Sequence, residues 1–126
     1  MVKVLSGVRI NMEHKEITIR FRAVNRDIFL AIKNGTKKIE TRAATKKYQK
    51  IQKGDTLIFV CEKSKFKKQI KEIEHFSSVK SLVKKYKPTA INPNARSEKE
   101  LSEMYDKFPG YKEKIKEFGI VAWKLK

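Results

Sequence analysis

The residues best placed to do chemistry lie in one short segment, Gly-Thr-Lys-Lys-Ile-Glu-Thr-Arg at positions 35–42. Alternate residues of a strand point to one face, so Glu40 and Arg42 would stand side by side if this segment is extended. Lys37 lies three residues before Glu40, where such a strand would begin. A carboxylate beside a guanidinium and an ammonium group has three uses: a structural ion pair, a binding site for a polar ligand, or a catalytic pair.

In the binding interpretation, Arg42 and Lys37 hold a phosphate or a base edge, because a guanidinium presents a planar fork that matches either. Glu40 then orients the arginine or accepts a hydrogen bond from an exocyclic amine. In the catalytic interpretation, Lys37 is a base whose pKa is lowered by burial or by Arg42, and Glu40 activates water. No Ser, Cys or His is placed to form a nucleophile pair with them, so we favour binding and keep Lys37 and Glu40 as candidate catalytic residues. Thr41 alternates to the opposite face, where we expect it to pack or bond inside.

A helix and a strand must position these residues. Asn25 is a candidate N-cap, and the apolar residues within 28–32 follow helical spacing. Gly35 ends that helix, because glycine adopts the left-handed conformation freely. Residues 38–42 then form the strand that carries the motif. Before the helix, apolar residues alternate with polar ones over 17–22, which predicts another strand.

Three further apolar segments predict strands. Residues 57–61 are continuously apolar, which is typical of a strand buried on both faces, and Cys61 at its end is expected in the core. Residues 66–76 form the next strand, with a bulge where its isoleucines are three apart, at Ile70 and Ile73. Residues 118–125 are apolar at both parities, which indicates a central strand.

Two helices are expected between these last strands. Residues 79–86 carry apolar side chains at helical spacing, and Pro88 closes that segment. Residues 97–100 read as a capping box that opens a helix over 101–108, ended by Pro109 and Gly110. The sequence thus predicts an α+β protein: a small, mostly antiparallel β-barrel of five or six strands with three or four short helices packed outside.

The composition indicates one folded domain over residues 1–126, with 40% hydrophobic and 36% charged residues. Residues 1–14 are weakly patterned and form either an extra strand or a tail. The single cysteine excludes an internal disulfide, and no run approaches the roughly 18 apolar residues of a membrane span. With no export signal either, we expect a cytoplasmic protein. His14 and His75 have no Cys or His at metal-ligand spacing, so we expect no metal and no cofactor.

Charge is the strongest bulk signal. The formal net charge is +17, and residues 37–87 hold sixteen of the 31 basic residues but only five of the 14 acidic ones. Such a field attracts polyanions, although a Lys-rich surface is also typical of proteins from hot environments or of proteins at anionic membranes. We expect RNA as the partner, single-stranded or structured, with single-stranded DNA as a second ligand and no membrane. Besides the motif, the candidate contact residues are Lys46, Lys47, Tyr48 and Lys50 in one basic loop, with Tyr48 able to stack a base, and Lys65, Lys67 and Lys68 in another.

Residues 29–42, followed by 51–59, resemble the ASCH domain of the PUA-like superfamily. The shared pattern is a helix, then Gly-x-Lys-x-x-Glu-x-Arg, then Gly-Asp before a buried strand, and the likeness covers about residues 17–125. The resemblance implies a β-barrel with a cleft, with Lys37, Glu40 and Arg42 at its opening. It also implies an RNA-binding module, which is the function we expect.

One bacterial branch of similar fold is an amidohydrolase of N4-acetylcytidine that uses a Lys, a Thr and a Glu. By resemblance its lysine falls on Lys37 and its threonine on Glu40, which is a departure. Its glutamate falls near residues 92–94, where there is no carboxylate, and Glu98 is the nearest acid downstream. An amidohydrolase acting on a modified nucleoside is therefore the alternative function.

Overall fold

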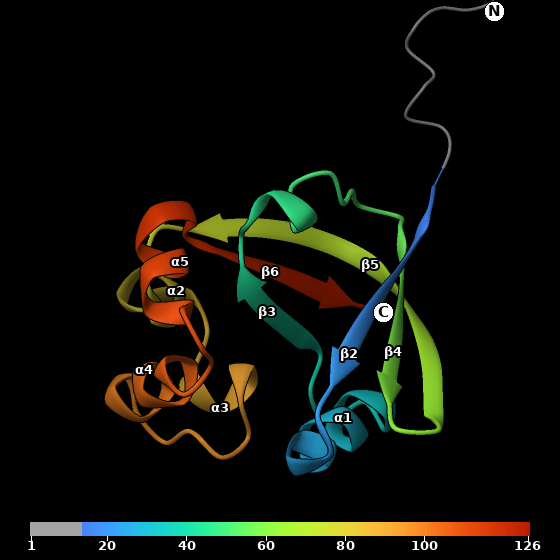
Figure 1. Cartoon of the computed structure of the whole chain (residues 1–126), viewed down its shortest axis with the longest axis horizontal. Helices are drawn as coiled ribbons and strands as arrows, with labels where there is room; N and C mark the ends of the chain where they lie inside the picture. The colour runs from blue at the N-terminus through green and yellow to red at the C-terminus, as the bar shows by residue number, and fades with distance from the viewer. Residues whose placement is uncertain (1–13) are drawn as a thin grey trace, which may run out of the picture.

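The computed structural model describes residues 14–126, and within them the strands form one curled sheet (Figure 1). The strands are β2 (Glu16–Phe21), β3 (Ile39–Ala43), β4 (Thr56–Cys61), β5 (Ser64–Phe76) and β6 (Ile120–Leu125). Their order is β2-β4-β5-β6-β3. β2 and β4 pair in parallel and the other neighbours are antiparallel. This confirms the predicted mostly antiparallel sheet of five strands, which curls into a half-barrel. All but His14 of the weakly patterned segment 1–14 lies outside the described residues.

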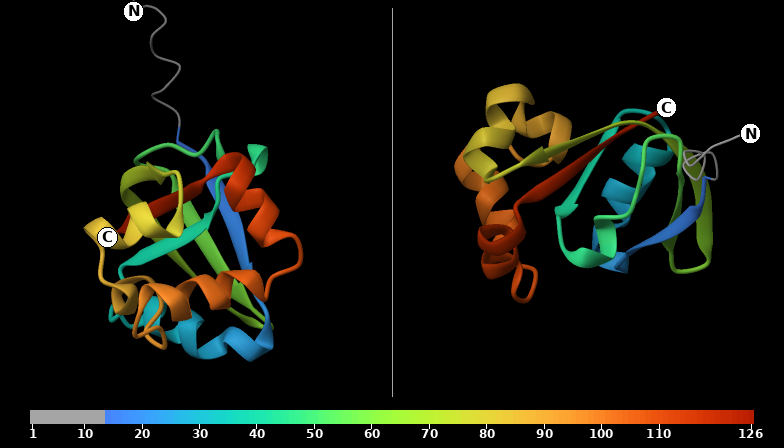
Figure 2. Two further views of the ribbon diagram at one scale, coloured as in Figure 1. Left: turned by 90° about the vertical axis from the view of Figure 1, so that its left-hand side faces the viewer. Right: turned by 90° about the horizontal axis from the view of Figure 1, so that it is seen from above.

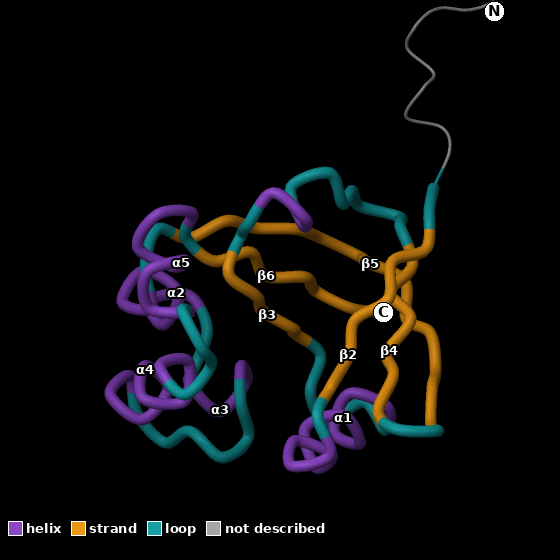
Figure 3. The backbone as a smooth tube through the Cα atoms, in the orientation of Figure 1, coloured by secondary structure: helices purple, strands orange, loops and turns teal. Residues whose placement is uncertain are grey.

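The helices form two groups, apart from the 3-10 helix η3 (Lys46–Tyr48) in the loop after β3 (Figure 3). One group is the short 3-10 helix η2 (Ala23–Asn25) with α1 (Arg26–Lys33), which closes one end of the curl. The other is a separate layer at one side of the sheet, made of α2 (Val79–Lys85), α3 (Pro88–Ile91), α4 (Glu98–Asp106) and α5 (Tyr111–Phe118). Figure 2 shows this layer beside the barrel when seen from above. None of the helices in residues 14–126 is long and apolar enough to cross a membrane.

Strand β6 joins two hydrophobic cores. Its Val121, Trp123 and Leu125 face the inside of the curl, where they pack with α1 and with β4. Its Ile120 and Ala122 face the helical layer. This two-sided burial explains why the strand is apolar at both parities, and it confirms the prediction that it is central.

The structure corrects the prediction for β4. Leu57, Phe59 and Cys61 are fully buried, but Ile58 and Val60 are only half-buried. The strand is thus covered on one face only, because the helical layer packs against β3 and β6 and leaves the outer face of β4 open. The predicted irregularity in β5 is confirmed as a register shift between Ile70 and Glu72.

The helical layer holds two elements that the sequence pattern did not predict. α3 begins at Pro88, which was expected only to close the preceding segment. α5 buries no residue completely, so its apolar stripe is too weak to stand out from its lysines and glutamates. The predicted capping box at α4 is half formed: the Ser97 side chain accepts from the Glu100 N–H, but the Glu100 carboxylate bonds to Arg96 instead. Asn25 stands at the N-cap of α1 without a side-chain cap bond.

Gly35 and Gly119 both have a positive φ, but a side chain at Gly119 would also meet a steric clash, so the two can be compared. At Gly119 φ is +79°, and a Cβ would lie 2.5 Å from the carbonyl oxygen of Phe76, whereas at Gly35 φ is +87° and a Cβ would meet nothing within 4 Å. We expect Gly35→Ala to cost about 1–2 kcal/mol of the free energy of unfolding, from the left-handed backbone alone. Gly119→Ala should cost clearly more, because β5 and β6 must also move apart. Urea unfolding of both variants measures this, and equal losses would contradict it.

Candidate functional site

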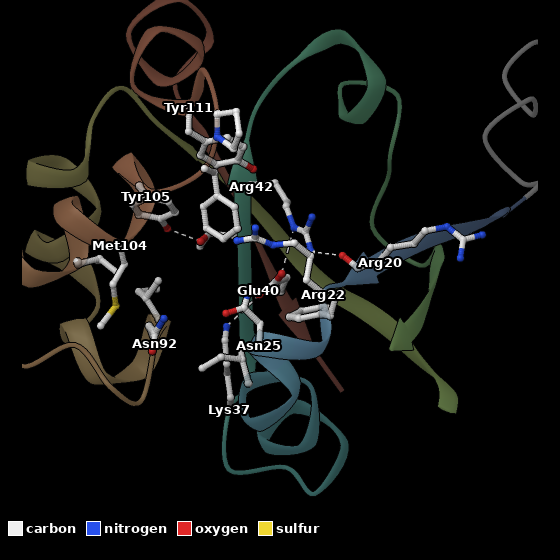
Figure 4. Close-up of a pocket in the computed structure, with 17 residues that line it drawn as sticks. Arg20, Arg22, Asn25, Lys37, Glu40, Arg42, Asn92, Met104, Tyr105 and Tyr111 are labelled. Carbon is white, nitrogen blue, oxygen red and sulfur yellow. Dashed lines mark hydrogen bonds and ion pairs between the residues drawn. The ribbon is translucent and has the colours of Figure 1, made fainter. Parts of the chain in front are cut away.

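A pocket of about 430 Å³ opens between the half-barrel and the helical layer (Figure 4). Its volume is typical of ligand sites, which span roughly 300–1,000 Å³. One wall comes from the end of β2, the start of α1 and β3, and carries Lys37, Glu40 and Arg42. The opposite wall comes from α3, α4 and the segment before α5, and Figure 4 shows Asn92 and Tyr105 there, facing the charged residues.

The three motif side chains meet as predicted. Glu40 lies between two cations: its Oε1 is 3.1 Å from the Nζ of Lys37, and its Oε2 is 3.1 Å from the Nε of Arg42. Lys37 also donates to the carbonyl of Ile39. The exposed side-chain fractions are 2% for Lys37, 7% for Glu40 and 20% for Arg42. The three residues of this ion-pair cluster thus also line the pocket, and we call them the charge triad.

Local hydrogen bonds fix the triad in place. After α1, Gly35 turns the chain, and the N–H of Lys37 donates to the carbonyl of Ala31 over 2.9 Å. This bond directs the lysine side chain back under the strand that follows.

The Gly-Asp part of the motif has a structural role, because the buried Asp55 carboxylate accepts from the backbone N–H groups of Lys15 and Gln52.

Burial and charge set the protonation of the triad. Burial lowers the pKa of the Lys37 amine below its ordinary value, and it outweighs the nearby Glu40 carboxylate, which raises it. For Arg42 burial also opposes the charged form, but Glu40 outweighs it and raises the pKa of the guanidinium. Among the described residues that line the pocket, Glu40 is the only carboxylate, so the site carries excess positive charge whenever Lys37 is protonated.

Two tyrosines link the helical layer to β3 by hydrogen bonds. Tyr105 of α4 shares a hydrogen bond with the Thr41 hydroxyl, and the Tyr111 hydroxyl accepts from the N–H of Ala43. Burial raises the pKa of Tyr105, so it remains a neutral phenol. Thr41 thus bonds inside, as expected, and Tyr105 is a core residue that also lines the pocket. Both faces of β3 contribute to the pocket because β3 is one of the two edge strands of the sheet.

The predicted loop residues lie outside the pocket lining. Lys46, Lys47 and Lys50 are exposed around the 3-10 helix η3 (Lys46–Tyr48). Tyr48 is half-buried with its ring edge-on to Trp123, at 5.4 Å between centroids, so the barrel core holds it. On β5, Lys65 and Lys67 are exposed and Lys68 is half-buried, and Lys67 forms an ion pair with Glu16.

Sequence reasoning missed most of the pocket wall. Met104 and Phe108 face the triad from α4 and the segment after it, and Arg22 faces it from the end of β2. The apolar stripe of α4 was visible in the sequence, but nothing local indicates that part of it borders a cavity. One feature of the sequence could have indicated Arg22: it is a basic residue at the end of a predicted strand in a strongly basic chain.

Removing the shared carboxylate should destabilise the protein. Glu40→Gln leaves two buried or half-buried cations without their counter-ion, and breaking a buried pair in this way costs about 3–5 kcal/mol. Urea unfolding near neutral pH measures the loss. The control is Glu16→Gln, which breaks an exposed pair with Lys67 and should change stability little. A loss no larger than the control's would contradict the burial of the triad.

Lys37 should make stability depend on pH. Its folded pKa lies below 10.5, so between the two values the unfolded chain binds more protons than the native one, and stability rises with pH. Lys37→Met removes this contribution while leaving Glu40 paired with Arg42. We expect the stability of the wild type relative to Lys37→Met to increase as the pH rises from the folded pKa of Lys37 toward 10.5, as measured by urea unfolding. A constant difference would show that the pKa of Lys37 is not lowered.

Comparisons with known proteins agree on the family. A model of the ASCH domain matches residues 23–126, while no curated protein matches the chain. The crystal structure of the hypothetical protein PH0355 superposes with a TM-score of 0.71 at 28% identity, covering 90% of this chain and 98% of that one. The solution NMR structure of protein PF0455 from Pyrococcus furiosus gives 0.67 at 25% identity, covering 90% and 96%. ASCH domains have a PUA-like fold and generally bind RNA. With more than half of its length matched and the motif residues assembled at one pocket, this chain belongs to the ASCH domain family.

Proposed function

We propose that this protein is an RNA-binding module whose pocket receives a single nucleotide at the charge triad. The observation that carries the proposal is a ligand-sized pocket with an apolar wall on one side and two cations, Lys37 and Arg42, around one carboxylate on the other. Unpaired RNA is commonly bound by this combination, because a splayed base needs an apolar or aromatic surface and its backbone needs cations. The family and the net charge of +17 support the same assignment.

Within the triad, each residue has a distinct role in this proposal. Both oxygens of Glu40 are engaged, which makes Glu40 the residue that orients Arg42 and leaves it few free lone pairs for a base. Arg42 uses Nε for Glu40 and one terminal nitrogen for a long bond of 3.4 Å to the carbonyl of Arg20. Its remaining N–H groups are available to a phosphate or a base edge.

The exposed lysines would contribute a second, less selective part of the binding. Lys46, Lys47 and Lys50 around η3 and Lys65 on β5 are exposed. Contacts from such mobile side chains to phosphates add affinity without reading the sequence, and salt weakens them. Single-stranded DNA would share these phosphate contacts, so it is the second ligand of the proposal.

Binding across a salt series tests the proposal. Labelled single-stranded RNA, hairpin RNA, single-stranded DNA and duplex DNA are titrated with the wild type, with Arg42→Gln and with Lys84→Gln. Lys84 is an exposed residue of α2 outside the pocket lining, so its variant matches the loss of charge. We expect RNA affinity to fall by about 0.7 log units per log unit of salt for each phosphate contacted.

Arg42→Gln should weaken RNA binding about tenfold or more beyond the loss in Lys84→Gln, since hydrogen bonds to a charged group are worth about 1.5–3 kcal/mol. Equal losses in the two variants would show that only the charge matters and that the pocket is not used. No affinity of the wild type for RNA at physiological salt would refute the RNA-binding proposal itself.

A second candidate, hydrolysis of a modified nucleoside, rests on Lys37. Its amine lines the pocket, and burial lowers its pKa, as a catalytic lysine requires. Against it, the single carboxylate among the described lining residues is already shared by Lys37 and Arg42. Incubation with N4-acetylcytidine distinguishes the two: release of cytidine and acetate by the wild type but not by Lys37→Met would establish the enzyme.

A further inference from the structure

Arg22 reaches across the mouth of the pocket. It follows the last residue of β2, and its guanidinium carbon lies 5.2 Å from the ring centroid of Phe108, just beyond α4 on the opposite wall. Arg42 has the same relation to Phe21, again at 5.2 Å. Two guanidinium groups that line one pocket are thus each held against the face of an aromatic ring.

Stacking of this kind fixes a guanidinium and leaves its N–H groups free. The attraction runs between the cation and the face of the ring, so the donors in the guanidinium plane are not consumed. Within residues 14–126 the Arg22 side chain donates no hydrogen bond and pairs with no carboxylate, and its residue is exposed. Arg42 keeps donors beyond those it gives to Glu40 and to the Arg20 carbonyl.

The charges around this mouth are unbalanced. Lys37, Arg22 and Arg42 line the pocket against the single carboxylate of Glu40, whose two oxygens are already occupied. Figure 4 places Arg22 beside the triad, whereas the side chain of Arg20, which also belongs to the pocket lining, extends away from the triad. The free donors therefore gather at one end of the cavity.

The opposite wall has a different character. Ile91, Leu101 and Met104 of α3 and α4 line it, with the neutral phenol of Tyr105 bonded to Thr41. A ligand that satisfies both ends has a flat, weakly polar part and an anionic group with several acceptor oxygens. Among the parts of a nucleotide, the base fits the first description and the phosphate the second.

We propose that Arg22 and Arg42 form a phosphate-binding fork at the pocket mouth, so that the pocket selects a nucleoside monophosphate over the bare nucleoside. The inference rests on the proposed function in taking the ligand to be a nucleotide. It adds Arg22 to the binding residues, and it gives the bound nucleotide an orientation, with its phosphate at the arginines and its base toward α3 and α4. Two guanidinium groups match the acceptor oxygens of one phosphate. The same fork takes the phosphate of a free mononucleotide or of a nucleotide within a strand.

The test compares each nucleotide with its own nucleoside. AMP, CMP, GMP and UMP, the four nucleosides and inorganic phosphate are titrated against the wild type by calorimetry. We expect at least one monophosphate to bind about tenfold or more tightly than its nucleoside, because each phosphate contact is a charge-assisted hydrogen bond. Inorganic phosphate alone should bind weakly, since it lacks the base that fills the pocket.

Matched variants locate the effect. Arg22→Gln should reduce the preference for the monophosphate about tenfold, and Arg22→Lys should restore only part of it, because an ammonium group keeps the charge but loses the fork. Lys84→Gln removes the same charge outside the pocket lining and should leave the preference unchanged. Equal urea midpoints for the three variants show that each is folded. Equal affinity of the wild type for nucleosides and monophosphates, or an equal loss in Lys84→Gln, would overturn the fork.

A short single-stranded RNA in the same experiment separates this inference from the proposed function. RNA binding without any preference for monophosphates would overturn the fork and keep the RNA-binding module. A preference for a monophosphate that depends on Arg22, without binding of RNA, would keep the fork and overturn the module. RNA binding that is lost in Arg22→Gln but kept in Lys84→Gln would support both.

Discussion

The site depends on one carboxylate shared by two cations. Glu40 gives one oxygen to Lys37 and the other to Arg42, and all three side chains are mostly removed from water. Taking charges from water costs several kcal/mol for each ion, and mutual attraction offsets this only when the geometry is good. While Lys37 is protonated, one negative charge cannot neutralise two positive ones, so the arrangement leaves an excess of positive charge. In the proposed function that excess attracts an anionic ligand.

The helical layer supplies the second wall of the pocket. β3 is an edge strand of the sheet, and its Glu40 and Arg42 lie on the face inside the curl, whereas Thr41 faces the layer. Tyr105 and Tyr111 bind β3 through the Thr41 hydroxyl and the N–H of Ala43, so α4 and α5 are held at the distance that leaves a cavity. β6 holds the helical layer against the sheet, because alternate residues of this strand pack into the barrel core and into the helical core. The pocket lies between these two cores, which are joined through β6.

The sequence predicts what depends on local periodicity. Glu40 and Arg42 fall on one face because strands alternate, the irregularity in β5 follows from the spacing of its isoleucines, and β6 is central because it is apolar at both parities. It does not predict which face of the sheet the helices cover. For that reason the outer face of β4 was expected to be buried, although it is half-exposed. α5 was missed for a different reason, because it has no completely buried residue and therefore only a weak apolar stripe.

The pocket wall depends on contacts between residues far apart in the chain. Arg22 and Phe108 are neighbours in space only because the layer returns to the end of β2, and no spacing in the sequence encodes that distance. The motif and its resemblance indicated a cleft at the triad, but they could not indicate what stands opposite it. Tyr48 is a case in which the sequence context was misleading. Its basic neighbours suggested a ring free to stack on a base, whereas the ring packs against Trp123.

Two kinds of positive charge follow from this fold, and they differ in what they can recognise. The surface lysines are exposed, so in the proposed function they would contact phosphates without selectivity, and salt would screen them. The pocket arginines are held, Arg42 by Glu40 and Phe21 and Arg22 by Phe108, so in the same proposal they would recognise the geometry of one phosphate. Shape selection requires fixed donors, because a side chain that adapts to every ligand cannot discriminate among them. Affinity and selectivity in this protein are therefore expected to reside in different residues, with selectivity confined to the few charges that the fold has made rigid.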